Sequence, residues 1–257
     1  MIFITGDTHG EIFRFTLFRE MFQPSVDDYL IVAGDFGCIF GLGWRDENKL
    51  DELEKLPFTI LFLDGNHECF PKIMSYPEEE WNGGRIHRIR SNIFHLMRGQ
   101  IFVLEGLSIF TMGGGYSIDQ MLRIPGRSWW PEEMPNANEY AEALSNLAKH
   151  GDRVDVIISH AAPEGAMQFF VDTGIITNRF LQEQPLNTFL EKVRQTVLHK
   201  HYYFGHMHLD KRLPHNQTAL FTDVYCLNTG KETLPRQTLD TLSSEISRDD
   251  PIGNEVW

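Results

Sequence analysis

MIFITGDTHG, residues 1–10, joins a short apolar run to a Gly-Asp turn and a histidine. Four further apolar runs lead into a similar turn with a polar side chain: Tyr29–Ala33, Thr59–Leu63, Val154–Ile158 and His201–Phe204. Runs of this length, rich in apolar residues and bounded by turn residues, are typical of strands buried on both faces. The sequence therefore predicts a first strand at Ile2–Thr5 and four related strands after it.

Helical patterns lie between these strands, where apolar residues recur every three to four positions. They cover Phe15 to Phe22, Leu50 to Leu56, about 138 to 150, and Leu186 to Val197. Further strands are expected at 86–93, 100–105, 107–112 and 219–227. Strands that alternate with helices indicate an α/β layered core. We expect a mixed β-sandwich of two sheets flanked by helices, in one domain over residues 1–235 with a polar tail over 236–257.

The 257 residues carry a formal net charge of −13, with 23 Lys and Arg against 36 Asp and Glu. A long nucleic acid needs a basic face, so this class of partner is not expected. No apolar run reaches the roughly 18 to 20 residues that a membrane span needs, and the N-terminus lacks the basic start of a signal peptide. Three cysteines at no disulfide or metal spacing fit a reducing compartment. We expect a cytoplasmic location; the oligomeric state is left open.

Metal-binding side chains follow the five strands, in the turns at their carboxyl ends. They are Asp7 and His9, Asp35, Asn66 and His67, His160, and His206 and His208. Ligand sites of open α/β folds gather at the carboxyl ends of strands. Oxygen and imidazole donors without thiolate suit Mn²⁺, Fe²⁺ or Zn²⁺. Eight such residues exceed the needs of one ion and favour a two-metal site, the arrangement used in phosphoryl transfer.

The segments GDTHG, GDFG, GNHE, SH and GHMH, in this order, resemble the five blocks of the calcineurin-like metallophosphoesterases. The resemblance implies that family's two-sheet fold and two divalent ions, Mn²⁺ in the first place, with Fe²⁺ or Zn²⁺ as alternatives. Asp35 would bridge the ions. The first ion would be held by Asp7, His9 and His208, and the second by Asn66, His160 and His206. A water or hydroxide between the ions would attack a small phosphomonoester or phosphodiester in line.

His67 matches the catalytic histidine of the family, which protonates the leaving oxygen or stabilises its charge. Many relatives have a second aspartate three residues after the one that matches Asp35, and it orients this histidine. Here that position is Cys38, so the partner of His67 is not identified from the sequence. The missing Asp-Arg pair also argues against the protein Ser/Thr phosphatase branch. A Gly-Gly-x-x-Ser-x-Asp element at 113–119 is similar to one in some bacterial members of the family.

Three residues near this element are candidates for substrate contacts: Tyr116, Arg123 and Trp129. Arg123 could pair with a phosphate or form a surface ion pair with Asp119. Trp129 could stack on a ring of the substrate, or one of the adjacent Trp129 and Trp130 could anchor the loop while the other is partly exposed. The alternative to an enzyme is a catalytically inactive scaffold of the same fold. That alternative is disfavoured because every position that matches a metal ligand is present.

Overall fold

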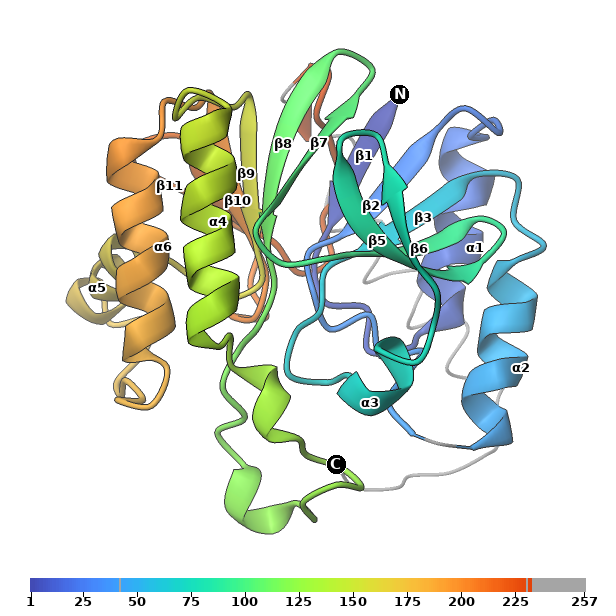
Figure 1. Cartoon of the computed structure of the whole chain (residues 1–257), viewed down its shortest axis with the longest axis horizontal. Coiled ribbons are helices and arrows are strands. Elements are labelled where there is room, and N and C mark those ends of the chain that lie inside the picture. Colours follow the sequence, from blue (N-terminus) through green and yellow to red (C-terminus); the bar gives the residue numbers. More distant parts are fainter. Residues whose placement is uncertain (42, 230, 233–257) are drawn as a thin grey trace.

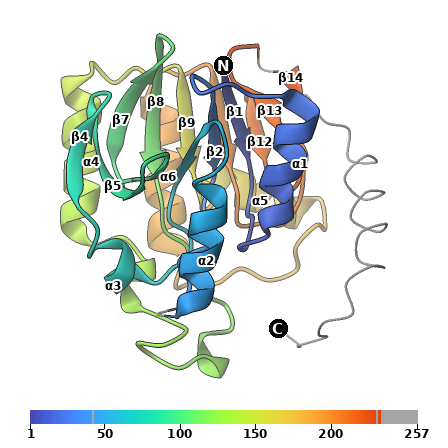
Figure 2. The same cartoon turned by 90° about the vertical axis from the view of Figure 1, so that its right-hand side faces the viewer.

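The computed structural model describes residues 1–41, 43–229 and 231–232. Two β-sheets lie face to face, and helices cover the outer face of each sheet (Figures 1 and 2). The predicted mixed β-sandwich flanked by helices is therefore confirmed. The boundary predicted at residue 235 and the tail predicted over 236–257 lie outside the described residues. In the described part of the chain, no helix combines the length and apolar character needed to cross a membrane.

The first sheet has the strand order β14-β13-β1-β2-β3-β6-β5-β4. Its strands are β1 (Ile2–Thr5), β2 (Tyr29–Val32), β3 (Thr59–Phe62), β4 (Glu78–Trp81), β5 (Gly84–Arg90), β6 (Ile93–Leu96), β13 (Tyr225–Cys226) and β14 (Lys231–Glu232). The second sheet has the order β11-β12-β10-β9-β8-β7. Its strands are β7 (Gln100–Leu104), β8 (Leu107–Met112), β9 (Val156–Ser159), β10 (His201–Phe204), β11 (Lys211–Leu213) and β12 (Gln217–Ala219).

Three helices cover the first sheet: α1 (Ile12–Phe22), α2 (Trp44–Leu53) and α3 (Phe70–Ile73). Three others cover the second sheet: α4 (Ala137–Lys149), α5 (Glu164–Asp172) and α6 (Gln184–Thr196). Two short 3₁₀ turns, Gln120–Leu122 and Pro131–Glu133, lie in the segment that joins β8 to α4. Asn136 and Glu139 form a capping box at the start of α4, which satisfies backbone donors there.

Side-chain alternation along the strands produces this layered arrangement. Ile2 and Ile4 pack in the core between the two sheets, whereas Phe3 between them packs under α1 against Phe18. In the second sheet Tyr203 faces the first sheet, and its neighbours face the helices. A strand with apolar residues on both faces is stable only where an apolar layer covers each face. The continuous apolar runs in the sequence are explained by this requirement.

Parallel pairing places the strand ends that carry polar side chains at one edge. β1, β2 and β3 are parallel neighbours in the first sheet, and β8, β9 and β10 are parallel neighbours in the second. The carboxyl ends within each sheet therefore lie together. The two edges also meet, because His160 Nδ1 after β9 lies 3.0 Å from the carbonyl oxygen of Ala33 after β2. The sandwich thus brings all five predicted turns to one rim.

Two strand predictions were wrong in detail. The run 86–93 is divided between β5 and β6, which pair antiparallel across a turn at residues 91–92. Asn92 in that turn donates to the carbonyl oxygens of Leu56 and Phe58, which stabilises the break. The run 219–227 is also not one strand, because the chain crosses there from β12 in one sheet to β13 in the other. Asp210 accepts backbone N–H bonds from Phe221, Thr222 and Asp223 in this crossing.

A buried ion-pair cluster supports the end of β3. The Asp64 carboxylate lies 2.6 Å from an Arg98 nitrogen and 3.0 Å from His95 Nε2, and the Asp64 and Arg98 side chains are almost fully buried. Burial alone would raise the pKa of Asp64, but Arg98 and His95 outweigh this effect and hold the pKa well below its usual range. The charged form is therefore favoured in the folded protein. Its contribution to stability is present above the unfolded-state pKa of about 3.9 and is lost as the pH falls below it.

We expect Asp64→Asn to lower the free energy of unfolding at pH 7 by about 3 kcal/mol, because it leaves the buried Arg98 charge with one partner fewer. Below about pH 4 the difference between the variant and the parent protein should shrink. Urea unfolding followed by circular dichroism at pH 7 and pH 3.5 measures both values. Asp51→Asn removes a carboxylate that is 61% exposed and should cost less than about 1 kcal/mol. A difference that does not change with pH would contradict this account.

Candidate metal centre

Asp35, in the turn after β2, lies at the centre of the rim. Its Oδ1 accepts the backbone N–H of His67 at 2.8 Å and lies 3.5 Å from His160 Nε2. Its Oδ2 lies 4.0 Å from His9 Nε2. Donor atoms of His9, Asp35 and His67 lie within 4.8 Å of one another, and so do those of Asp35, His160 and His206. One carboxylate therefore belongs to two neighbouring groups of donors.

Asp7 and Asn66 lie beside this carboxylate and are themselves positioned by hydrogen bonds. Both Asp7 carboxylate oxygens accept the backbone N–H of His206 at 3.0 Å. Asn66 Nδ2 donates to Ser117 Oγ at 3.3 Å, and Asn66 Oδ1 lies 3.3 Å from His160 Nε2. The amide oxygen of Asn66 is thus directed toward the histidines. Oxygen is the atom of an amide that binds a metal ion.

His9 and His208 complete the rim on its exposed side. Their Nε2 atoms lie 2.9 Å apart, so the two rings point at one place. The ring of His208 stacks on Phe221 with centroids 5.0 Å apart and planes at 16°. The structure therefore brings together Asp7, His9, Asp35, Asn66, His160, His206 and His208, the residues that the sequence nominated for metal binding.

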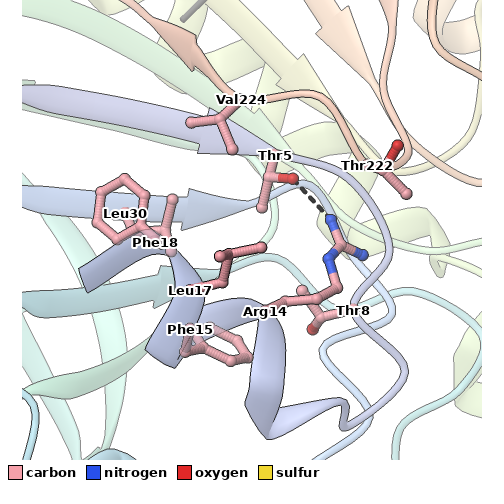
Figure 3. A pocket seen from close by; sticks show the side chains of 9 residues that line it. All are labelled: Thr5, Thr8, Arg14, Phe15, Leu17, Phe18, Leu30, Thr222 and Val224. Atoms are coloured by element: carbon pink, nitrogen blue, oxygen red, sulfur yellow. Dashed lines mark hydrogen bonds between the residues drawn. The ribbon is translucent and has the colours of Figure 1, made fainter. Parts of the chain in front are cut away.

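Arg14 on α1 holds two of these segments from behind. Its guanidinium donates to the carbonyl oxygen of Asp7, to Thr5 Oγ1 at 2.7 Å and to the carbonyl oxygen of Phe221 at 2.6 Å. Figure 3 shows this guanidinium beside a small cavity, with the hydrogen bond to Thr5 drawn. Arg14 therefore fixes two features to helix α1: the turn that carries Asp7, and Phe221, on which the ring of His208 stacks.

The backbone at the rim is strained. The residues His9, Asp35, His206 and His208 all have left-handed φ angles of 48°, 48°, 66° and 48°. Non-glycine residues adopt such angles at a cost, and they cluster at functional sites. Gly65 shows how closely the turns approach, because a Cβ atom there would lie 2.1 Å from Asp35 Oδ1. The recurring Gly-Asp, Gly-Asn and Gly-His pairs are explained by this crowding.

Burial and charge act together on the acidic groups of the rim. Burial and the neighbouring Asp35 charge raise the pKa of Asp7 to about 8. Burial also acts to raise the pKa of Asp35, but the surrounding imidazoles outweigh it and lower the pKa. Burial lowers the pKa of His160 to about 4, which leaves this imidazole neutral. Burial acts to lower the pKa of His206 too, but the Glu183 carboxylate outweighs it and raises the pKa to about 9.

The donor set fits two divalent cations. Asp7 and Asp35 are each 1% exposed, and carboxylates buried side by side repel one another unless positive charge compensates them. Carboxylate, amide and imidazole donors suit borderline and hard divalent ions. The shared position of Asp35 gives each of two ions a contact with the same carboxylate. The residues present therefore match the requirements of a two-metal site.

His67 lies at the edge of this centre, next to His9, with ring centroids 4.9 Å apart. Its Nε2 lies 3.0 Å from an Arg123 nitrogen, and its ring stacks on Phe40. Because a guanidinium can only donate, Nε2 of His67 accepts this hydrogen bond. Arg123 also pairs with Asp119 at 2.7 Å. The partners of His67 that the sequence left unidentified are thus Arg123 and Phe40.

The other two residues that the sequence nominated for substrate contacts are Tyr116 and Trp129. Tyr116 donates its backbone N–H to Glu183, and its ring lies 6.3 Å from Phe180. Trp130 is buried against Phe40, whereas Trp129 is partly exposed, as expected for a loop anchored by one of two tryptophans. Trp129 Nε1 has no hydrogen-bond partner among the described residues. Among the described residues, neither the Tyr116 nor the Trp129 side chain forms a hydrogen bond or ring stacking with a metal-binding side chain.

Two buried glutamates near the centre were missed from the sequence. Glu133 accepts from both the backbone N–H and the hydroxyl of Ser117, which in turn orients Asn66. Glu183 lies 3.0 Å from His206 Nε2. No periodicity or motif marks Glu183, so the sequence offered no signal for it.

In a comparison with protein-family models, the model described as calcineurin-like phosphoesterase matches residues 1–210. The matched range contains all five strand-end turns and both sheets up to β10. No curated protein matches the chain in a sequence search.

Proposed function

The chain belongs to the calcineurin-like phosphoesterase family, and from this premise we propose that it is a metal-dependent phosphoesterase acting on a small phosphate monoester or diester. The observation that carries the proposal is the position of Asp35, which is shared by two groups of donor side chains. Members of the family typically bind two divalent metal ions. Two adjacent ions can together stabilise the attacking and the leaving oxygens in the hydrolysis of a phosphate ester.

Seven side chains would hold the two ions. Asp7, His9 and His208 would bind the first ion, Asn66, His160 and His206 the second, and Asp35 both. The ions, which we propose to be Mn²⁺, would supply Lewis-acid charge stabilisation and a water of lowered pKa as the nucleophile. The protein contributes the fixed geometry: Ser117 orients Asn66, Asp7 is held by the His206 N–H, and Phe221 supports His208.

His67 and Arg123 would act on the substrate itself. Arg123 directs a largely buried guanidinium to the edge of the centre, where a phosphate oxygen could accept the hydrogen bond that Arg123 now donates to His67. Release of Nε2 from Arg123 would let His67 carry a proton there and give it to the leaving oxygen. Tyr116 and Trp129 would form the surrounding wall. These assignments rest on position and on the chemistry of the side chains.

The acidic composition of the chain is compatible with this substrate class. The net charge of −13 disfavours a broad polyanion-binding face. Two divalent ions would make the centre itself locally positive, which suits one small phosphate ester. The three cysteines are all free and buried, which supports the proposed cytoplasmic location.

We expect exhaustive dialysis against EDTA to abolish hydrolysis of p-nitrophenyl phosphate and of its bis ester, and added Mn²⁺ to restore it. Initial rates before dialysis, after dialysis and after Mn²⁺, Fe²⁺ or Zn²⁺ addition test this expectation. The ratio of the two ester activities reports the preference for mono- or diesters. Activity that survives complete chelation, verified by metal analysis, would rule out the proposed function.

A further inference from the structure

Glu183 lies directly before α6, outside all five strand-end turns, and is 5% exposed. Its Oε1 lies 3.0 Å from His206 Nε2 and accepts the backbone N–H of Tyr116 at 3.0 Å. Its Oε2 accepts from Asn187 Nδ2 at 3.2 Å. A buried carboxylate is costly unless such partners satisfy it. Two of these contacts, with His206 and Tyr116, reach segments that are distant in the sequence, and the third is with Asn187 on α6 itself.

The contact with His206 determines which ring nitrogen is free. Because the carboxylate can only accept, His206 Nε2 carries a proton in this pair, so Nδ1 is the nitrogen that would bind an ion after giving up its own proton. A nitrogen of His206 lies within 4.8 Å of donor atoms of both Asp35 and His160. A histidine that binds a metal usually donates its other N–H to a carboxylate or carbonyl, which fixes the tautomer and the ring orientation.

The same carboxylate is fixed on its far side. Asn187 Nδ2 donates both to Glu183 and to the carbonyl oxygen of Ala162 at 2.9 Å, and Ala162 follows His160 closely in the chain. Glu183 is thus tied to the turn after β9, while its Oε1 contacts the turn after β10 and the segment after β8. Glu183 and Asn187 together therefore connect three segments that follow strands of the second sheet.

We propose that Glu183 is a positioning residue for the ion that His206 binds, and that it couples this ion to the segment carrying Tyr116. The inference rests on the proposed two-metal function. It assigns to Glu183 the orientation of His206 rather than a direct metal contact. The first ion, whose donors Asp7, His9 and His208 make no described hydrogen bond with Glu183, depends on it much less.

The test is Mn²⁺ binding to metal-free protein, measured by titration calorimetry and by electron paramagnetic resonance. The parent protein is expected to bind two ions that give the spectrum of a coupled pair. In Glu183→Gln and Glu183→Ala one ion should keep its affinity and the other should bind about 10- to 100-fold more weakly. At intermediate Mn²⁺ the spectrum should then be that of an isolated ion.

Glu164→Gln provides the matched control, because Glu164 on α5 pairs with Arg179 at the surface of the same layer. It should bind both ions as the parent protein does. Glu183→Gln keeps the size of the side chain, so it decides the matter if the alanine variant does not fold. Folded Glu183→Gln with unchanged affinity for both ions, or with both ions lost equally, overturns the inference. A parent protein that binds no Mn²⁺ refutes instead the proposed function.

Discussion

Asp35→Asn should lose both metal binding and activity. Asp35 lies within reach of both groups of donors, so removal of its charge weakens both ion positions at once. Loss of about 4 kcal/mol of transition-state charge stabilisation corresponds to a roughly 10³-fold lower rate. The substitution keeps an oxygen that can accept the His67 backbone N–H, so the turn should be preserved.

Metal content by mass spectrometry and initial rates with bis-p-nitrophenyl phosphate measure the two effects of Asp35→Asn. Asp51→Asn, the same change on the exposed face of α2, serves as the control and should leave both unchanged. Circular dichroism verifies that the variant is folded. Retention of two ions with full activity would contradict the proposal that Asp35 binds both ions.

His67→Ala should keep both ions and turn over substrate about 10²- to 10⁴-fold more slowly, the range expected for loss of a general acid. His67 lies beside the centre and is bonded through Nε2 to Arg123 rather than to a carboxylate. Its removal therefore takes away the proton donor proposed for the leaving oxygen but not a donor that the ions need.

Comparison of two substrates sharpens the test of His67. An ester with a poor leaving group needs protonation more than p-nitrophenyl phosphate does, so its hydrolysis should suffer the larger loss. His150→Ala, at the exposed end of α4, is the matched control and should be fully active. A loss of metal in His67→Ala would show that His67 is itself a metal ligand.

Several features of the fold followed from local patterns. The runs before Gly6, Gly34 and Gly205 were predicted as buried strands, because their apolar character and turn residues are encoded within a few positions. The strand predictions that failed are those in which one apolar run is divided between two strands. Asn92 lies in the turn between β5 and β6. It donates hydrogen bonds to the carbonyl oxygens of Leu56 and Phe58, which are far away in the sequence.

The candidate site was predictable to different extents for different residues. His9 and Asp35 stand in short motifs after strands, and parallel pairing alone predicts that they meet. For Arg123 the sequence left two roles open, an ion pair with Asp119 and a position at the site. In the structure Arg123 contacts both Asp119 and His67. Glu183 could not be found from the sequence, because its partners at the site lie in other segments of the chain. Tyr116 is 67 residues away, and His206 lies in the turn after β10.

The sequence by itself determined the donor types, their order along the chain and their place at strand ends, since hydrophobic periodicity and turn chemistry are local properties. Only the tertiary structure decided which atoms face each other across the rim: Asp35 between two donor groups, Arg123 on His67, and Glu183 on His206. These contacts depend on how the two sheets stack and on the paths of the loops that leave them. Packing of that kind sums interactions between distant segments, and no spacing in the sequence records it.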